Sequence, residues 1–176
     1  MQEIFQKIPK ASLEYVKGLI KYENILFKLK NNRKTKHGDF SVKKDFSVEI
    51  TINSDMNSFR FLITLLHEIS HFFVYKDFGF NTKPHGYQWK SKFKELLIPV
   101  INNEVFPDDI LRPLAKYAVN PKASTDTDLD LSIALNKYNV NVFGYQTKYY
   151  KICPGAKSFM EKVGIRLLYL GAIFNT

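Results

Sequence analysis

Two spacings of apolar residues alternate along the first 140 residues of the chain. Residues 25–30, 40–43 and 46–52 place apolar and polar side chains in turn, as strands with one buried face do. A turn-rich segment over residues 31–39 follows the first strand, and Lys44-Asp45 forms a tight turn after the second. We expect a three-stranded antiparallel sheet, whose edge is able to align an extended peptide.

The other apolar residues recur at helical spacing. Residues 10–21 predict an N-terminal helix, and residues 59–73 are apolar nearly all round, as in a buried helix. Further helices are predicted over residues 87–101, 107–118 and 125–138. The sequence therefore predicts an α+β fold.

The last forty residues have a strand-like but ambiguous pattern. We expect one domain over residues 1–140 and a small strand-rich extension over residues 141–176 packed on it, with residues 165–174 as a terminal core element. The chain's one cysteine, Cys153, has no base nearby and is not interpreted as a nucleophile. A single cysteine also fits a reducing compartment rather than a disulfide scaffold.

The buried helix carries the motif His67-Glu68-Ile69-Ser70-His71. Residues four apart lie one above the other on a helix, so the imidazoles of His67 and His71 can reach one metal ion. Glu68 is displaced to the side, where it can take a proton from water without binding the metal. Titratable groups in a buried helix are costly unless paired or bound to metal, which favours a zinc site.

A catalytic zinc site needs a third protein ligand. His85 lies fourteen residues beyond His71, in a loop bracketed by Gly79 and Pro84, and is the candidate we favour. The alternative is Glu95, further along the next helix.

Three neighbouring residues receive simpler predictions. Trp89 lies on the same helix face as His85 and is expected to pack against the zinc helix. Tyr87 is a weak candidate for stabilising an oxyanion. His37 is interpreted as a polar turn residue.

His67-Glu68-x-x-His71 followed by His85-Gly86-x-x-Trp89 resembles the SprT-like zinc metalloproteases, and the likeness covers most of residues 10–150. The resemblance implies a minimal zincin fold for residues 1–140, with Zn²⁺ on His67, His71 and His85. It further implies that Glu68 is the catalytic base and that the substrates are proteins bound or crosslinked to DNA. Many family members end in a cysteine zinc ribbon, which a chain with only Cys153 lacks.

The net charge of +9 is unevenly distributed. Residues 28–44 hold seven Lys and Arg against one Asp, a net +6, and residues 137–176 carry a net +5. Clustered positive charge is typical of a polyanion partner. We therefore expect DNA to bind through basic faces that include Lys34, Lys36, Lys43 and Lys44.

These patterns predict a zinc-dependent metallopeptidase acting on protein or peptide substrates. One alternative is a non-enzymatic, basic nucleic-acid-binding module with a structural zinc site, although such a site has no use for Glu68. Another is a zinc hydrolase of a different bond. Residues 1–10 contain no signal peptide and no apolar run is long enough to span a membrane, so we expect a cytoplasmic monomer.

Overall fold

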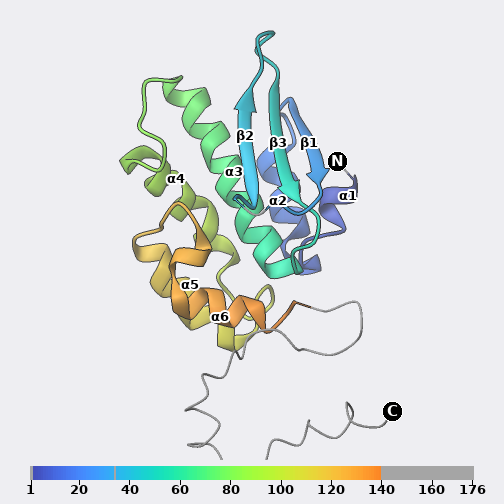
Figure 1. Ribbon diagram of the computed structural model, residues 1–176, viewed down its shortest axis with the longest axis vertical. Coiled ribbons are helices and arrows are strands. Elements are labelled where there is room, and N and C mark those ends of the chain that lie inside the picture. The colour runs from blue at the N-terminus through green and yellow to red at the C-terminus, as the bar shows by residue number, and fades with distance from the viewer. Residues whose placement is uncertain (1, 34, 140–176) are drawn as a thin grey trace, which may run out of the picture. The chain divides into compact units, whose positions relative to one another are not determined.

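The computed structural model describes residues 2–33 and 35–139 of the 176-residue chain (Figure 1). Within these residues, six α-helices and three strands confirm the predicted α+β class. The extension predicted over residues 141–176, including Cys153, lies outside the described residues, and so does Lys34.

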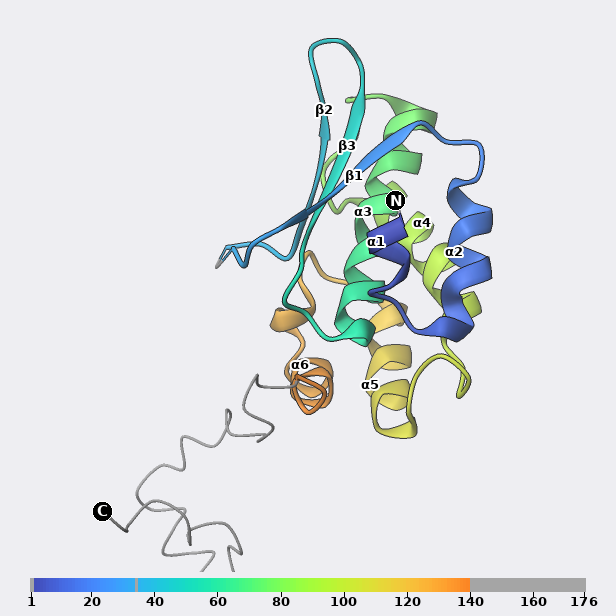
Figure 2. The ribbon, with the colours of Figure 1, turned by 90° about the vertical axis from the view of Figure 1, so that its right-hand side faces the viewer.

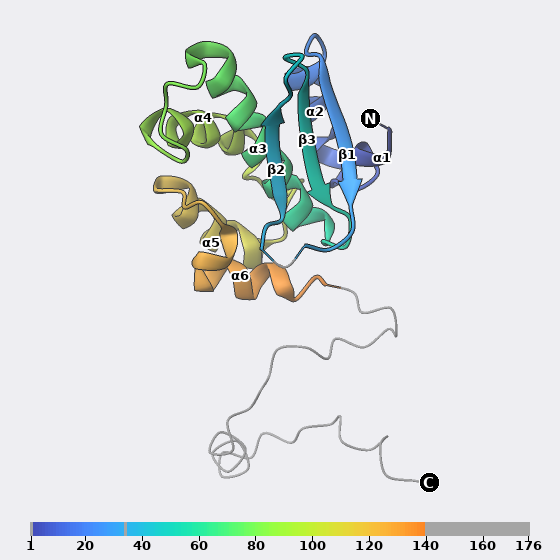
Figure 3. The same cartoon turned by 45° about the horizontal axis from the view of Figure 1, so that its top comes forward.

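The sheet consists of β1 (Ile25–Lys30), β2 (Gly38–Val42) and β3 (Val48–Asn53). The strand order is β1-β3-β2, with β2 antiparallel and β1 parallel to β3 (Figure 3). The prediction of an antiparallel sheet is therefore wrong, because the sheet is mixed. The chain leaves β1, skips one position and enters β2, which leaves the central position to β3. All six residues of β3 are buried, as expected for a strand with a neighbour on each side.

The polar side chains of β3 lie among basic partners. Lys28 and Lys43 both pair with Glu49, and Arg33 donates to the Thr51 hydroxyl. The apolar side chains of β3 alternate with these and belong to the core. Helices α1 (Gln2–Phe5), α2 (Leu13–Ile20) and α3 (Ser58–Phe78) lie on one face of the sheet (Figure 2).

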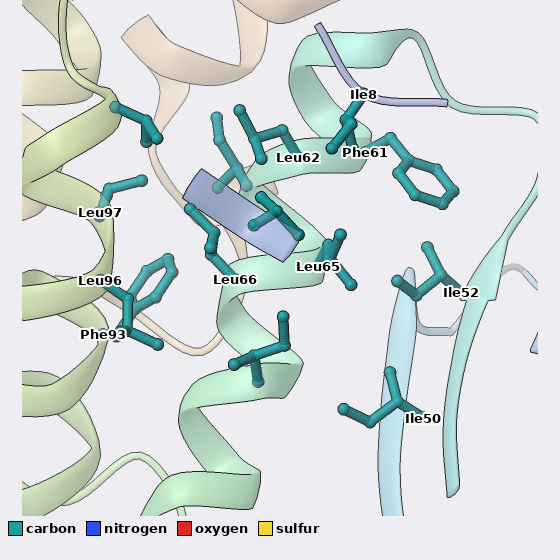
Figure 4. Packing of buried hydrophobic residues seen from close by; sticks show 14 of the residues in the cluster. Ile8, Ile50, Ile52, Phe61, Leu62, Leu65, Leu66, Phe93, Leu96 and Leu97 are labelled. Atoms are coloured by element: carbon teal, nitrogen blue, oxygen red, sulfur yellow. The ribbon is translucent and has the colours of Figure 1, made fainter. Parts of the chain in front are cut away.

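Helix α3 runs between the sheet and α4 (Tyr87–Leu97). Its first turn is capped by Asn57, whose side chain accepts a hydrogen bond from the Arg60 backbone. Leu65 turns toward Ile52 on β3, and Leu66 turns toward Phe93 on α4 (Figure 4). Burial on both sides explains why this helix is apolar nearly all round.

The remaining elements differ from the prediction mainly at their ends. The N-terminal helix consists of a 3₁₀ turn, η1 (Lys10–Ser12), and α2, and α4 continues into η2 (Ile98–Val100). Helix α5 covers Asp108–Val119. The helix predicted over residues 125–138 is instead a 3₁₀ turn, η3 (Thr125–Thr127), followed by α6 (Leu129–Asn136). The division occurs at Asp128, whose side chain caps α6 by accepting from the Leu131 backbone at 3.1 Å.

Among the described residues, no helix has the length and apolar character that a membrane crossing requires.

Candidate metal centre

The side chains of His67, His71 and His85 meet at their Nε2 atoms. His67 and His71 lie one turn apart on α3, and their Nε2 atoms are 3.2 Å apart. His85 precedes α4, and its Nε2 lies 3.1 Å from that of His67 and 3.0 Å from that of His71. The predicted pair and the favoured third histidine are thus brought together.

Hydrogen bonds alone do not explain this cluster. A neutral imidazole nitrogen is either a donor or an acceptor, so among three nitrogens at least two must be of the same kind. Two N–H groups or two lone pairs that face each other at these distances repel, whereas three lone pairs directed at one cation are each satisfied. The three histidines therefore form a group able to hold a metal ion.

The geometry fits zinc. In a tetrahedral site with Zn–N bonds of about 2.0–2.1 Å, two ligand nitrogens lie about 3.3–3.4 Å apart. The observed separations of 3.0–3.2 Å approach this value. Three protein ligands also leave a fourth position open, as catalytic zinc sites do.

Desolvation favours the neutral form of all three imidazoles, which is the form that binds metal. Burial lowers the pKa of His67 well below its ordinary value, and repulsion from His71 and His85 adds to the shift. Burial also lowers the pKa of His71, to about 4, and that of His85. The cluster is therefore poised to bind a cation at neutral pH.

A tight turn presents His85 to the helix pair. The Gly86 N–H donates to the Lys83 carbonyl at 2.9 Å, and His85 has a φ of 56°. Because Pro84 fixes its own φ near −65°, this combination is a type II turn. A Cβ at Gly86 would lie 2.8 Å from the Lys83 oxygen, so the turn also needs glycine there.

Trp89 packs against the three histidine rings and against α3, as the sequence predicted. It is 1% exposed, and its ring centroid lies 4.5, 5.4 and 4.7 Å from those of His67, His71 and His85. Its indole N–H also donates to the His67 carbonyl at 3.4 Å. One side chain thus limits the movement of all three rings.

Glu68 lies beside the histidines and is 5% exposed. Burial, and after it the charge of the nearby Asp39, raise the pKa of its carboxyl group, which is about 8. Arg33, Lys36 and a hydrogen bond from the Phe40 backbone act in the opposite direction. A cation held by the histidines would likewise favour the ionised carboxylate.

Strand β2 passes directly over Glu68. A Cβ added to Gly38 would lie 2.8 Å from Cγ and 2.9 Å from Cδ of Glu68. Only glycine lets the backbone of β2 approach the carboxylate this closely. The sequence shows a glycine here but nothing about its partner, so Gly38 was not among the predicted site residues.

The histidines and Glu68 lie in a cleft of about 460 Å³. Its walls come from residues 35–40 at the start of β2, from α3, from the His85 turn and from residues 123–126 before α6. The three histidines and Glu68 are therefore accessible from the same space.

The comparisons with known proteins support this arrangement. A family model described as the SprT-like family matches residues 2–105, a segment that contains His67, Glu68, His71 and His85. The chain belongs to the SprT-like family. Searches of curated proteins and of solved structures found no match to this SprT-like chain.

Two candidate residues of the SprT-like domain lie away from the cluster. Glu95 is an exposed residue of α4 whose carboxylate pairs with Lys92 at 2.8 Å. Tyr87, at the start of α4, is 83% exposed and is not among the residues that line the cleft.

Of the predicted nucleic-acid-binding lysines that the structure describes, Lys36 precedes β2, and Lys43 and Lys44 lie between β2 and β3. Lys36 pairs with Asp39 at 2.8 Å, and Lys43 pairs with Glu49 at 2.9 Å. Lys44 is exposed at the hairpin turn. Pairing within the SprT-like domain thus neutralises part of the charge that the sequence shows in this segment.

His37 lies at a bend in the predicted turn-rich segment before β2. It also lines the cleft, and its Nε2 lies 2.6 Å from Oδ2 of Asp126. These residues are 89 positions apart, and Asp126 lies beyond the segment matched by the SprT-like family model. No local pattern in the sequence indicates the pair.

Proposed function

We propose that this protein is a zinc-dependent metallopeptidase with a zincin-like fold. The observation that carries the proposal is the convergence of three imidazole nitrogens beside a buried carboxylate, inside one open cleft. A structural zinc site would be closed by a fourth protein ligand and would have no role for Glu68.

His67, His71 and His85 would hold the zinc ion, with Trp89 and the Lys83–Gly86 turn keeping their rings in place. Zinc bound there supplies a Lewis acid for the scissile carbonyl and lowers the pKa of water to about 7. Glu68 removes a proton from the attacking water and returns it to the leaving amine. The backbone hydrogen bond from Phe40 holds the Glu68 carboxylate toward the cleft.

The sheet provides a place for the substrate chain. Strand β2 is an edge strand of the sheet, and Asp39 and Phe40 of this strand line the cleft. An extended peptide that pairs with this edge would pass the metal ligands and Glu68, and its backbone would supply most of its affinity.

Proteins bound or crosslinked to DNA are the substrate class that we propose, in line with the family resemblance. The basic residues of the hairpin support this choice, since they would attract a nucleic-acid polymer. DNA would then concentrate the peptidase next to its substrates.

The variant Glu68→Gln tests the activity. It removes the base and leaves the three histidines, so we expect zinc content and thermal stability to be retained while casein cleavage falls by about 10²–10⁴-fold. Zinc is measured by elemental analysis and cleavage by release of soluble peptide. If the zinc-loaded parent cleaves no faster than Glu68→Gln on any protein substrate, the proposed function is wrong.

A further inference from the structure

All four histidines of the chain line the same cleft. Three of them form the metal-binding cluster, and the fourth, His37, faces the same space from the segment that enters β2. An imidazole in an active-site cleft can donate a hydrogen bond to a substrate or exchange a proton with it. His37 therefore has the chemistry and the location for a part in the reaction.

The ring of His37 is fixed by Asp126. Its Nε2 lies 2.6 Å from Oδ2 of Asp126, which leaves Nδ1 as the other polar atom of the ring. The His37 carbonyl accepts a hydrogen bond from the Asn53 backbone at 2.8 Å, so the backbone at this position is held as well. A carboxylate on one nitrogen orients an imidazole and stabilises its imidazolium form, in which both ring nitrogens are donors.

Asp126 is itself held by Arg60, which is 4% exposed. The Arg60 guanidinium donates to the other oxygen of Asp126, and also to the Thr125 hydroxyl at 3.2 Å and the Asn136 side chain at 3.1 Å. The hydrogen bond from His37 and the charge of Arg60 hold the pKa of Asp126 at about 2. The carboxylate is therefore ionised at neutral pH and is anchored to α3, the helix that carries the metal cluster.

The segment that holds His37 also passes close to Glu68. His37 directly precedes Gly38, where an added Cβ would lie within 3 Å of the Glu68 carboxyl group. A substrate carbonyl that is attacked by water activated at Glu68 would thus lie next to the wall formed by His37.

We propose that His37, held by Asp126, contacts the substrate as an imidazolium, whose Nε2–H donates to Asp126 while its Nδ1–H donates a hydrogen bond to the oxyanion that develops on the scissile carbonyl. This proposal rests on the proposed peptidase function. The tetrahedral intermediate of peptide hydrolysis carries negative charge on that oxygen, and a fixed donor stabilises it without reorganisation. His37 and Asp126 would replace Tyr87 in the role that the sequence had suggested for that residue.

The variant His37→Leu removes the donor and keeps a side chain of similar size. We expect kcat for a fluorogenic peptide, taken from a casein site that the parent cleaves, to fall by about 10²–10³-fold, as for loss of an oxyanion donor. We expect KM to change by less than about threefold, because the hydrogen bond strengthens only in the transition state. Zinc content and melting temperature are measured on the same samples and should match the parent.

Asp126→Asn and the double variant His37→Leu/Asp126→Asn distinguish the orientation of the His37 ring from its packing. Asp126→Asn should lower kcat because the ring loses its orienting charge. The double variant should be no slower than His37→Leu, because Asp126 acts through His37. Lys116→Ala is the control: it removes an ion pair between α5 and α6, formed with Asp130 at 2.9 Å, and should leave kcat unchanged.

The outcomes are distinct. Unchanged kcat in His37→Leu overturns the inference and gives His37 a purely structural role. If His37→Leu loses zinc or unfolds, Asp126→Asn decides: a reduced kcat in the folded, zinc-loaded variant supports the inference, and a full kcat overturns it. If the parent itself has no more activity than Glu68→Gln, the peptidase proposal fails and this inference fails with it.

Discussion

At the scale of single residues, the site depends on contacts that leave little room for substitution. His85 has a positive φ, a conformation that costs free energy for a non-glycine residue. The Lys83–Gly86 turn holds His85 in this conformation. Trp89 touches all three ligand rings. The position of each ligand is thus fixed by its neighbours as well as by its own backbone.

The first prediction concerns the third ligand. Loss of a residue that only hydrogen-bonds to a metal ligand typically weakens metal binding by roughly 10–100-fold. His85→Ala removes the proposed ligand itself and should weaken zinc binding by more than this. Glu95→Ala should retain one zinc per chain, because Glu95 is exposed and paired with Lys92. Competition with a chelator of known affinity measures both. Loss of zinc from Glu95→Ala together with full retention in His85→Ala would assign the third ligand to Glu95.

The second prediction concerns the contact between Gly38 and Glu68. Gly38→Ala forces the Glu68 side chain to move, because the new Cβ would lie within 3 Å of its Cγ and Cδ. We expect zinc and fold to be retained while peptidase kcat falls by about 10–10²-fold, the order expected for a misplaced catalytic group.

Gly18→Ala is the matched control for this change. A Cβ at Gly18 has nothing within 4 Å, and the residue lies inside helix α2. This variant should keep full activity and gain about 0.5–1 kcal/mol of stability from the better helix former. Equal activity of Gly38→Ala and the parent would mean that the close approach has no catalytic consequence.

At the scale of elements, the central strand combines two roles. Its apolar residues pack in the core, and its polar residues bind basic side chains from β1, from the hairpin turn and from the loop before β2. These ion pairs fix the outer face of the sheet whose edge strand borders the cleft. The metal ligands, in contrast, come from a helix and a turn on the other side.

The third prediction follows from Glu49, which accepts from Lys28 and Lys43. These hydrogen bonds lower its pKa in the folded protein to about 2, below its ordinary value of 4.5. A lowered pKa means that Glu49 contributes stability above about pH 4.5 and loses this contribution as the pH falls toward about 2. Glu49→Gln should therefore flatten the decrease in unfolding free energy over this range.

Urea unfolding of the chelator-treated protein at a series of pH values measures the effect, since removing metal excludes its release as a cause. Glu95→Gln is a suitable control, because Glu95 is exposed and pairs with Lys92 on its own helix. Parallel pH profiles for the parent and Glu49→Gln would show that the two ion pairs add nothing to acid sensitivity.

At the scale of the whole molecule, the net charge bears on the proposed nucleic-acid partner and the cleft bears on the proposed peptide substrate. A net charge of +9 favours the approach of a polyanion at long range, whereas in the proposed peptidase the cleft would select what is cleaved. Two lysines of the predicted DNA-binding set, Lys36 and Lys43, pair with carboxylates of the same domain. The unpaired charge that DNA would meet is therefore smaller than the sequence count.

The fourth prediction is that DNA binding is independent of sequence and weakened by salt. Each neutralised phosphate contributes roughly −0.9 to the slope of log affinity against log salt concentration. Replacing Lys34, Lys36, Lys43 and Lys44 by Ser should flatten this slope and leave zinc content unchanged. The control replaces Lys90, Lys92, Lys94 and Lys116 by Ser, which removes the same charge elsewhere. A slope near zero for the parent, or equal flattening in both variants, would contradict a binding site at the hairpin.

The sequence by itself determined the features that depend on local spacing. The period of apolar residues predicted the strands and helices, since each period matches one backbone geometry. The spacing of His67 and His71 placed two ligands on one helix face for the same reason. The turn residues around His85 favoured it over Glu95, and the structure places His85 with the other two histidines.

Tertiary structure alone decided the contacts between distant segments. The parallel pairing of β1 with β3 depends on which strand is buried at the centre, and a pattern along one strand does not encode that choice. The contact of Gly38 with Glu68 and the pairing of His37 with Asp126 depend on how β2 and η3 pack around α3. Such contacts join residues 30 to 89 positions apart, where the folded chain, and not local conformational preference, sets the distance.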